Sequence, residues 1–189
     1  YHYGGSVMGS RLLLFLAISS ASNLLLADQT DDRLVDLFAV LQETENVRTI
    51  QVTESQIWEI WLQHANADVA QLMLVGTQRM NTQRYSEAMV AFNRLTESFP
   101  NYAEGWNKRA TLHYVLGNLG ASVTDIEKTL ELEPRHFGAL SGLGMVFIQT
   151  KELSKAKRAF ENLIEVHPNS PNAKKNLELV EEQLRLSVI

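Results

Sequence analysis

The histidines are the first residues to test for chemistry, because an imidazole can act as a metal ligand or as a general base. The chain contains His2, His64, His113, His136 and His167. No two of them lie three or four residues apart, which is the spacing that lets two side chains on one helix face share a metal ion. The sequence therefore predicts no metal site and assigns the histidines structural roles.

Motifs for nucleophilic or nucleotide chemistry are incomplete in this chain. Ser141 lies among glycines, but its spacing from Gly138 and Gly142 does not match the G-x-S-x-G of a nucleophile elbow. Gly142 and Gly144 lack the third glycine of a dinucleotide loop. The chain has no cysteine, which excludes disulfides, thiolate zinc sites and a cysteine nucleophile. We predict a protein without catalytic residues or cofactor, and keep an enzyme with an unrecognised site as an alternative.

The charge pattern indicates whether the chain could bind nucleic acid. The net charge is −5, and no run of Lys and Arg exceeds two residues. Binding to nucleic acid requires a clustered basic face that neutralises phosphates. The sequence therefore predicts that the chain does not bind nucleic acid.

A repeat organises the second half of the chain. Pro100, Pro134 and Pro168 are 34 residues apart, since 134 − 100 = 34 and 168 − 134 = 34. Aligned at this period, columns of large apolar residues alternate with columns of small ones. The columns are Leu72, Trp106 and Leu140; Gly76, Ala110 and Gly144; Ala88, Ser122 and Ala156; and Phe92, Ile126 and Phe160. Small residues let two antiparallel helices approach closely, so we expect Gly144 to face Ala156 inside a hairpin.

This pattern resembles the tetratricopeptide repeat, a pair of helices with a period of about 34 residues, and the chain is similar to bacterial exported proteins that contain such repeats. The clearest copy runs from Ala103 to Pro134. Arg79, Arg109 and Thr129 depart from the family, which has apolar or aromatic residues there, so copy two is the least typical. The resemblance implies an all-α fold, a right-handed solenoid of helical hairpins. Its expected parts are an N-terminal helical region at 28–67, three repeats within 69–168 (69–102, 103–136 and 137–170), and a C-terminal capping helix at 171–189.

Residues 1–27 have the layout of a secretory signal peptide. Arg11 precedes the apolar run Leu12 to Ile18, and small residues follow, with cleavage expected after Ala21 or Ala27. The apolar stretch is shorter than the roughly 20 residues that a membrane-spanning helix needs. We therefore predict a periplasmic or otherwise exported protein without an integral membrane span. The alternatives are that this N-terminal segment anchors the protein to a membrane or targets it to an organelle.

The region before the repeats is predicted to form two helices. Apolar residues recur at helical spacing between Leu34 and Leu41. Thr53 and Gln56 have the spacing of a capping box, which predicts that the second helix begins there. Trp58 and Trp61 lie about one turn apart and need a surface to cover them. We expect this helical pair to cover the first repeat, with an exposed docking patch on the two tryptophans as the alternative.

The resemblance also implies a binding surface, because the first helix of each repeat in this family lines a concave groove. The matching positions that we predict to bind protein are Met73, Thr77 and Met80 in copy one, Asn107, Thr111 and Tyr114 in copy two, and Met145 and Ile148 in copy three. Methionine adapts to varied shapes, and asparagine is both donor and acceptor. We predict a non-enzymatic interaction scaffold that holds a peptide or helix segment in the groove. The alternatives are that some methionines pack between repeats and that the protein is a structural subunit of a cell-envelope assembly.

One subset of the family grips the carboxylate-ended tails of chaperones with Lys, Arg and Asn side chains. The matching positions here are Met73, Thr77, Lys108, Gly138 and Gly142, and a single one of them is basic. The sequence therefore argues against chaperone C-terminal tails as the partner.

Overall fold

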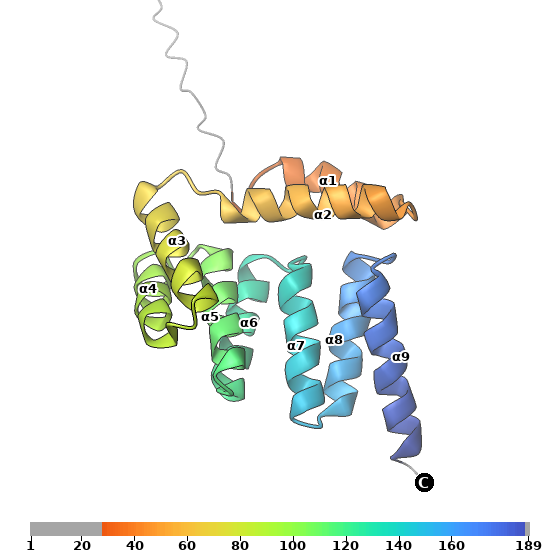
Figure 1. Cartoon of the computed structure of the whole chain (residues 1–189). Coiled ribbons are helices and arrows are strands. Elements are labelled where there is room, and N and C mark those ends of the chain that lie inside the picture. Colours follow the sequence, from red (N-terminus) through yellow and green to blue (C-terminus); the bar gives the residue numbers. More distant parts are fainter. Residues whose placement is uncertain (1–27, 188–189) are drawn as a thin grey trace, which may run out of the picture.

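The computed structural model describes residues 28–187 (Figure 1). In that part of the chain there are nine α-helices and no strand, which confirms the all-α prediction. The helices are α1 (Arg33–Glu43), α2 (Val47–Leu62), α3 (Ala67–Asn81), α4 (Tyr85–Ser98), α5 (Ala103–Val115), α6 (Leu119–Leu132), α7 (Phe137–Gln149), α8 (Leu153–Val166) and α9 (Pro171–Leu186). The predicted signal peptide lies outside the described residues. None of the helices between residues 28 and 187 is both long enough and apolar enough to span a membrane.

Three helical hairpins stack side by side and form the solenoid (Figure 1). They are α3 with α4, α5 with α6 and α7 with α8, and α9 packs against α8. Each hairpin turn has a left-handed residue at the same repeat position, with φ of 58° at Gln83, 76° at Gly117 and 61° at Lys151. This conformation lets the amide of the following residue donate a hydrogen bond to a carbonyl near the C-terminal end of the helix. Only glycine adopts it without steric cost.

Inside copies one and three, a phenylalanine ring lies directly on a glycine. A Cβ atom built on Gly76 would lie 2.4 Å from the ring of Phe92, and one on Gly144 would lie 2.4 Å from the ring of Phe160. Both rings are fully buried. The ring of Phe160, one helical turn beyond Ala156, thus fills the space that Gly144 leaves, and the expectation that Gly144 also faces Ala156 stays a prediction.

Copy two is held together by different contacts. The Arg109 guanidinium donates to both carboxylate oxygens of Asp125, at 2.7 and 2.8 Å, and also to the Thr96 hydroxyl at 2.8 Å. The side chain of Asp125 is almost fully buried. The departure of Arg109 from the family pattern is thus compensated by an ion pair that joins α5 to α6, while Thr96 ties both to α4.

The second helix begins earlier than the sequence predicts. The side chain of Asn46 accepts a hydrogen bond from the Thr49 amide at 3.0 Å, and α2 starts at Val47. Thr53 lies inside this helix and is buried. The expectation of a start at Thr53 is wrong because Asn46, also a good N-cap residue, satisfies the free amides at the true start.

The N-terminal pair lies across the ends of the repeat helices rather than over the first repeat (Figure 1). Trp61 is 1% exposed and stacks on His136, with 4.1 Å between ring centroids. Both Trp58 and Trp61 also contact Phe137, at 5.4 and 5.0 Å. The prediction that this pair covers the first repeat is therefore wrong, since both tryptophans pack on the residues that begin α7.

The outer face of the first repeat carries two polar side chains and one exposed leucine, Leu74, which is 63% exposed. Gln71 and Gln78 are exposed, and they stand at the repeat positions of Gly105 and Leu112, which are buried in copy two. Water can therefore solvate this end of the solenoid. At the other end, α9 buries Ala173 and Val180 and turns charged residues outward, as a capping helix does.

Candidate protein-binding groove

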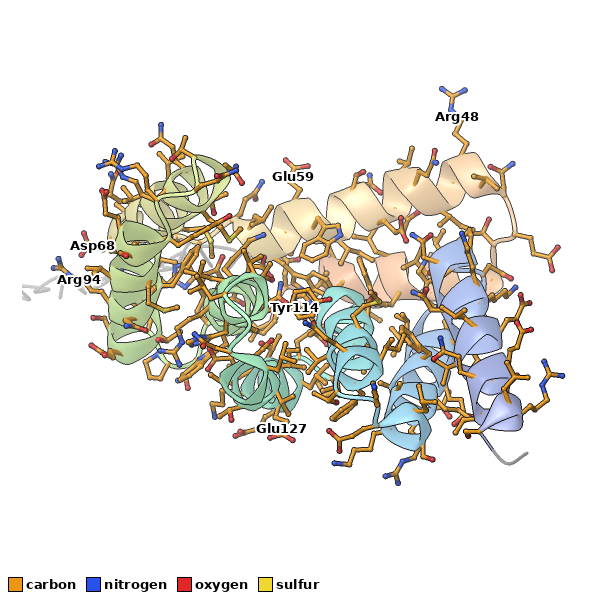
Figure 2. All side chains as sticks on the ribbon, turned by 60° about the horizontal axis from the view of Figure 1, so that its bottom comes forward. Arg48, Glu59, Asp68, Arg94, Tyr114 and Glu127 are labelled. Atoms are coloured by element: carbon orange, nitrogen blue, oxygen red, sulfur yellow. The ribbon has the colours of Figure 1, made fainter. Side chains whose placement is uncertain are left out.

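A pocket of about 180 Å³ lies among α5, α6 and α7. It brings together four of the eight residues predicted to bind protein: Asn107, Thr111, Tyr114 and Met145. Its other lining residues are Ala110, Ser122, Ile126, Ala139, Ser141 and Gly142. In Figure 2, Tyr114 is labelled between the α5–α6 pair and α7. The pocket is therefore formed by both helices of copy two and the first helix of copy three.

The other four predicted residues lie away from this pocket. Met73 is 6% exposed, and Met80 packs against the same core of copy one. The Thr77 hydroxyl lies 3.8 Å from the Met73 sulfur. Ile148 packs against the core shared by copy three and the N-terminal pair. Met73 and Met80 therefore pack within the protein, in line with the alternative prediction that some methionines have packing roles.

Asn107 has fewer free hydrogen-bonding groups than the sequence suggests. It is 7% exposed, and its amide nitrogen donates to a Glu104 carboxylate oxygen at 3.0 Å. The Thr111 hydroxyl donates to the backbone carbonyl of Asn107 at 2.9 Å. Within residues 28–187 no donor is paired with the side-chain oxygen of Asn107, so this residue can still accept one hydrogen bond.

A buried polar cluster, which sequence reasoning missed, lies beside the pocket. Glu104 is 1% exposed, and its carboxylate lies 2.9 Å from His136 Nε2 and 3.1 Å from Lys108 Nζ. The Ala139 amide donates to His136 Nδ1 at 3.1 Å, so the ring proton sits on Nε2 and points at Glu104. Burial alone would raise the pKa of Glu104, but the hydrogen bond from His136 and the charge of Lys108 outweigh it and hold the pKa below its ordinary value.

This cluster joins α5 to the start of α7 and contacts Asn107 of the pocket. Within residues 28–187, no group of three His, Cys, Asp or Glu side chains is placed to hold a metal ion. Glu104 and His136 lie 32 positions apart in the sequence, so local spacing could not pair them. The one available signal was the repeat alignment, in which Glu104 shares a column with Ala70 and Gly138.

Trp58 of α2 lies against Gly138 of α7 and near Lys108 of α5, outside the lining of the pocket. A Cβ atom built on Gly138 would lie 2.6 Å from its indole, and Lys108 Nζ lies 5.8 Å from the centre of its ring. Lys108 and Gly138 are two of the five positions that match the chaperone-tail clamp of the family. Helix α2 therefore contacts two of the positions that match this clamp.

Comparisons with known proteins agree with this architecture. The family model described as tetratricopeptide repeat matches residues 139–170. A TPR repeat-containing protein of Rhizobium etli is 30% identical over 152 residues, which cover 80% of this chain and 74% of the relative. Sperm-associated antigen 1 of Mus musculus is 29% identical over 112 residues, which cover 59% of this chain and 12% of that protein.

Solved structures of similar fold include proteins with bound peptides. The first TPR of Spaghetti (RPAP3), bound to an HSP90 peptide, superimposes with a TM-score of 0.60 at 20% identity, covering 62% of this chain and 94% of that one. The Yersinia enterocolitica chaperone SycD, in complex with a peptide of the translocator YopD, gives a TM-score of 0.59 at 13% identity, covering 63% and 96%. The first of these weakens the expectation that chaperone tails are excluded, because its fold accepts such a peptide.

Proposed function

The chain belongs to the tetratricopeptide repeat family, and we propose that it is a non-enzymatic interaction scaffold that holds an uncharged segment of a partner protein against α5, α6 and α7. The observation that carries this proposal is the pocket where Asn107, Thr111, Tyr114 and Met145 meet. A pocket with apolar walls and a few polar groups is the usual form of a site that binds a side chain and orients the backbone beside it.

The electrostatics of the pocket favour an uncharged ligand. Among the described residues that line it, none is charged. The nearest cation of the buried cluster, Lys108, is already paired with Glu104 at 3.1 Å. A charged side chain entering here would lose its hydration without gaining a free partner of opposite charge. An uncharged segment has no such cost.

Exposed apolar side chains lie at the edge of the pocket and elsewhere on the repeat helices. Met145 is 39% exposed at the edge, and Val115 at the end of α5 is 50% exposed. The repeat position of Met145 is occupied by Leu179 on α9, which is 46% exposed. The peptide complexes of the RPAP3 and SycD domains support the proposal, because proteins of this fold are found there with peptides of other proteins.

A matched pair of variants tests the proposal. Met145→Lys places a charge at the edge of the pocket, whereas Val90→Lys places one on exposed α4, at the repeat position where copy three has Arg158. Peptides selected from a random display library on the wild-type chain are expected to bind Met145→Lys more than about tenfold more weakly, since the cation must be desolvated. Their affinity for Val90→Lys should be unchanged by fluorescence anisotropy.

If the selected peptides bind the two lysine variants equally well, the binding site does not lie in this groove. The HSP90 peptide belongs in the same measurement, because a structural neighbour binds it. Tyr114→Ala is a better second variant than Asn107→Ala, since the amide of Asn107 also supports the buried carboxylate of Glu104. Circular dichroism of each variant checks that the fold is intact.

A further inference from the structure

One face of helix α2 contacts several successive parts of the solenoid. Glu54, Trp58 and Trp61 lie at positions i, i+4 and i+7 of this helix, so their side chains share one face. Two helical turns separate Glu54 from Trp61, which is about 10 Å along the axis. Packed helices lie 8–10 Å apart, so this face is long enough to reach from one repeat helix to the next.

The C-terminal end of α2 is fixed to the start of copy two. Tyr102, which directly precedes α5, is 3% exposed, and its hydroxyl donates to the backbone carbonyl of Trp61 at 2.8 Å. Trp61 lies in the last turn of α2, where carbonyls have no partner within the helix. This hydrogen bond therefore satisfies the end of α2 and ties it to α5.

Both tryptophans hold the start of α7. The ring of Trp61 stacks on His136, with 4.1 Å between centroids and 10° between planes. His136 is the N-cap residue of α7, so its position sets where this helix begins. The Trp58 indole lies on Gly138 so closely that a Cβ atom there would be 2.6 Å from it. Helix α7 therefore cannot move along or away from α2 without breaking these ring contacts.

The other end of the N-terminal pair holds the end of copy three. Glu54 Oε1 lies 2.9 Å from Nε2 of His167, which is 1% exposed and ends α8. The side-chain amide of Gln42, on α1, donates to the backbone carbonyls of Glu165 and Val166 at 2.8 Å. The N-terminal pair thus contacts the starts of α5 and α7 and the end of α8.

The spacing of α5 and α7 needs such a contact, because the pocket lies between them. Helix α5 packs more extensively on α6 than on α7, and the side chains of the three helices leave the space of about 180 Å³. In a solenoid each repeat contacts only its neighbours, and small rotations between repeats set the curvature. Packing between copies two and three alone therefore constrains the groove less than packing inside one hairpin does.

We propose that α2 is a brace that fixes the spacing of copies two and three and the capping helix, and so holds the concave groove at one width. Glu54 and Trp58 are then positioning residues: neither is among the described residues that line the pocket, but both set where the lining helices lie. The inference rests on the proposed function in making the braced groove the binding site. A preformed groove loses less conformational freedom when it binds a segment.

Distances across the groove test the brace without any peptide. The chain has no cysteine, so cysteines introduced at Glu127 of α6 and Glu182 of α9 would be the sole sites for spin labels. Both residues are exposed. Pulsed electron paramagnetic resonance on the full chain then gives the distribution of distances between copy two and the capping helix.

Glu54→Ala combined with Trp58→Ala removes two contacts of the brace, so the distance distribution should broaden. Glu59→Ala is the matched control, because Figure 2 shows Glu59 on the side of α2 that faces away from the repeat helices, and its distribution should be unchanged. Gly138→Ala keeps every other side chain but places a methyl group against Trp58, so the mean distance should shift.

Circular dichroism identifies the variants that fold, and Gly138→Ala decides the question alone if the double variant does not. Folded variants with the wild-type distribution would overturn the brace, as would equal broadening in Glu59→Ala. Peptides from the random library should bind the double variant at least about threefold more weakly, because the groove must be ordered on binding.

The two readouts separate this inference from the proposed function. If no peptide is selected, the proposed function fails, and the distances still decide whether α2 is a brace. Broadened distances with unchanged peptide affinity would overturn the link between the brace and the binding site. Broadened distances with weaker binding support both.

Discussion

At the contact between its two helices, copy two carries a charged pair where copies one and three are apolar. The pair is Arg109 and Asp125, against Val75 and Ala91 in copy one and Leu143 and Ala159 in copy three. The same copy also replaces a glycine and a ring with Ala110 and Ile126. Copies one and three are thus closed by apolar packing, whereas copy two is held by polar contacts and keeps an open pocket. A repeat can therefore replace an apolar contact between its two helices with an ion pair and keep the same hairpin.

Breaking the ion pair should have the largest effect on stability. Asp125→Ala leaves the Arg109 guanidinium without its carboxylate, and the loss of one partner of a buried pair costs about 3–5 kcal/mol. Arg109→Leu combined with Asp125→Ala recreates the apolar contact of copy three and should cost little or stabilise the protein. Urea unfolding of the single and double variants measures both. A double variant as unstable as Asp125→Ala would show that the pair has a role beyond its mutual charge.

Crowding the glycine contact should have the next largest effect. In Gly144→Ala the new methyl group meets the buried ring of Phe160, and overpacking of this kind costs about 1–3 kcal/mol. Adding Phe160→Ile gives copy three the pair found in copy two, so the double variant should be more stable than the sum of the single effects predicts. Glu161→Ala, on the outer face, is the control and should change the thermal midpoint little. Strict additivity in this cycle would contradict the contact.

The buried carboxylate should make stability depend on pH. Glu104→Gln is expected to cost about 1–2 kcal/mol near pH 7, because it removes a charged acceptor from His136 and Lys108. The pKa of Glu104 is held below its ordinary value, so the carboxylate contributes fully above that value and its contribution disappears as the pH falls through the lower folded-state pKa. The difference between wild type and variant should therefore shrink at acidic pH. A difference that grows on acidification would contradict the assignment.

The smallest effect concerns the hairpin turns, where copy two has glycine and the other copies do not. Lys151 has a φ of 61°, so Lys151→Gly relieves strain and should stabilise the protein by about 0.5–1 kcal/mol. Gly117→Lys should destabilise it by about 1 kcal/mol. Thermal unfolding of both variants checks the signs, and stabilisation by Gly117→Lys would show that the turn conformation is wrong.

The sequence predicted the hairpins because they depend on spacing within about 34 residues, and the columns of large and small residues record that packing. The sequence did not predict where α2 lies relative to the repeats, because the contact of Trp61 with His136 joins residues 75 positions apart. The ion pair of copy two was visible as two compensating departures in the same alignment, once Asp125 is compared with Ala91 and Ala159.

The candidate site was predicted only in part for the same reason. Asn107, Thr111, Tyr114 and Met145 share repeat positions that face the groove, and the structure brings them together. Met73 occupies the position equivalent to Asn107 and is about as buried, but it packs in the core of copy one and lines no part of this pocket, because the neighbouring helices decide what a repeat position contacts and spacing does not. Whether Ile126 leaves a pocket depends on how far α7 approaches α5 and α6, which coordinates show and a sequence does not.

The most direct test of the account is a methyl NMR map of the full chain with a peptide selected from the random library. The account predicts that the methyl groups of Ile126 and Met145 shift most, because the bound segment enters the pocket between copies two and three. The methyl groups of Met73 and Met89, in copy one, should shift least. Largest shifts in copy one, or at the indole groups of Trp58 and Trp61 without a change at Ile126, would contradict the claim that copy two is the binding centre of this solenoid.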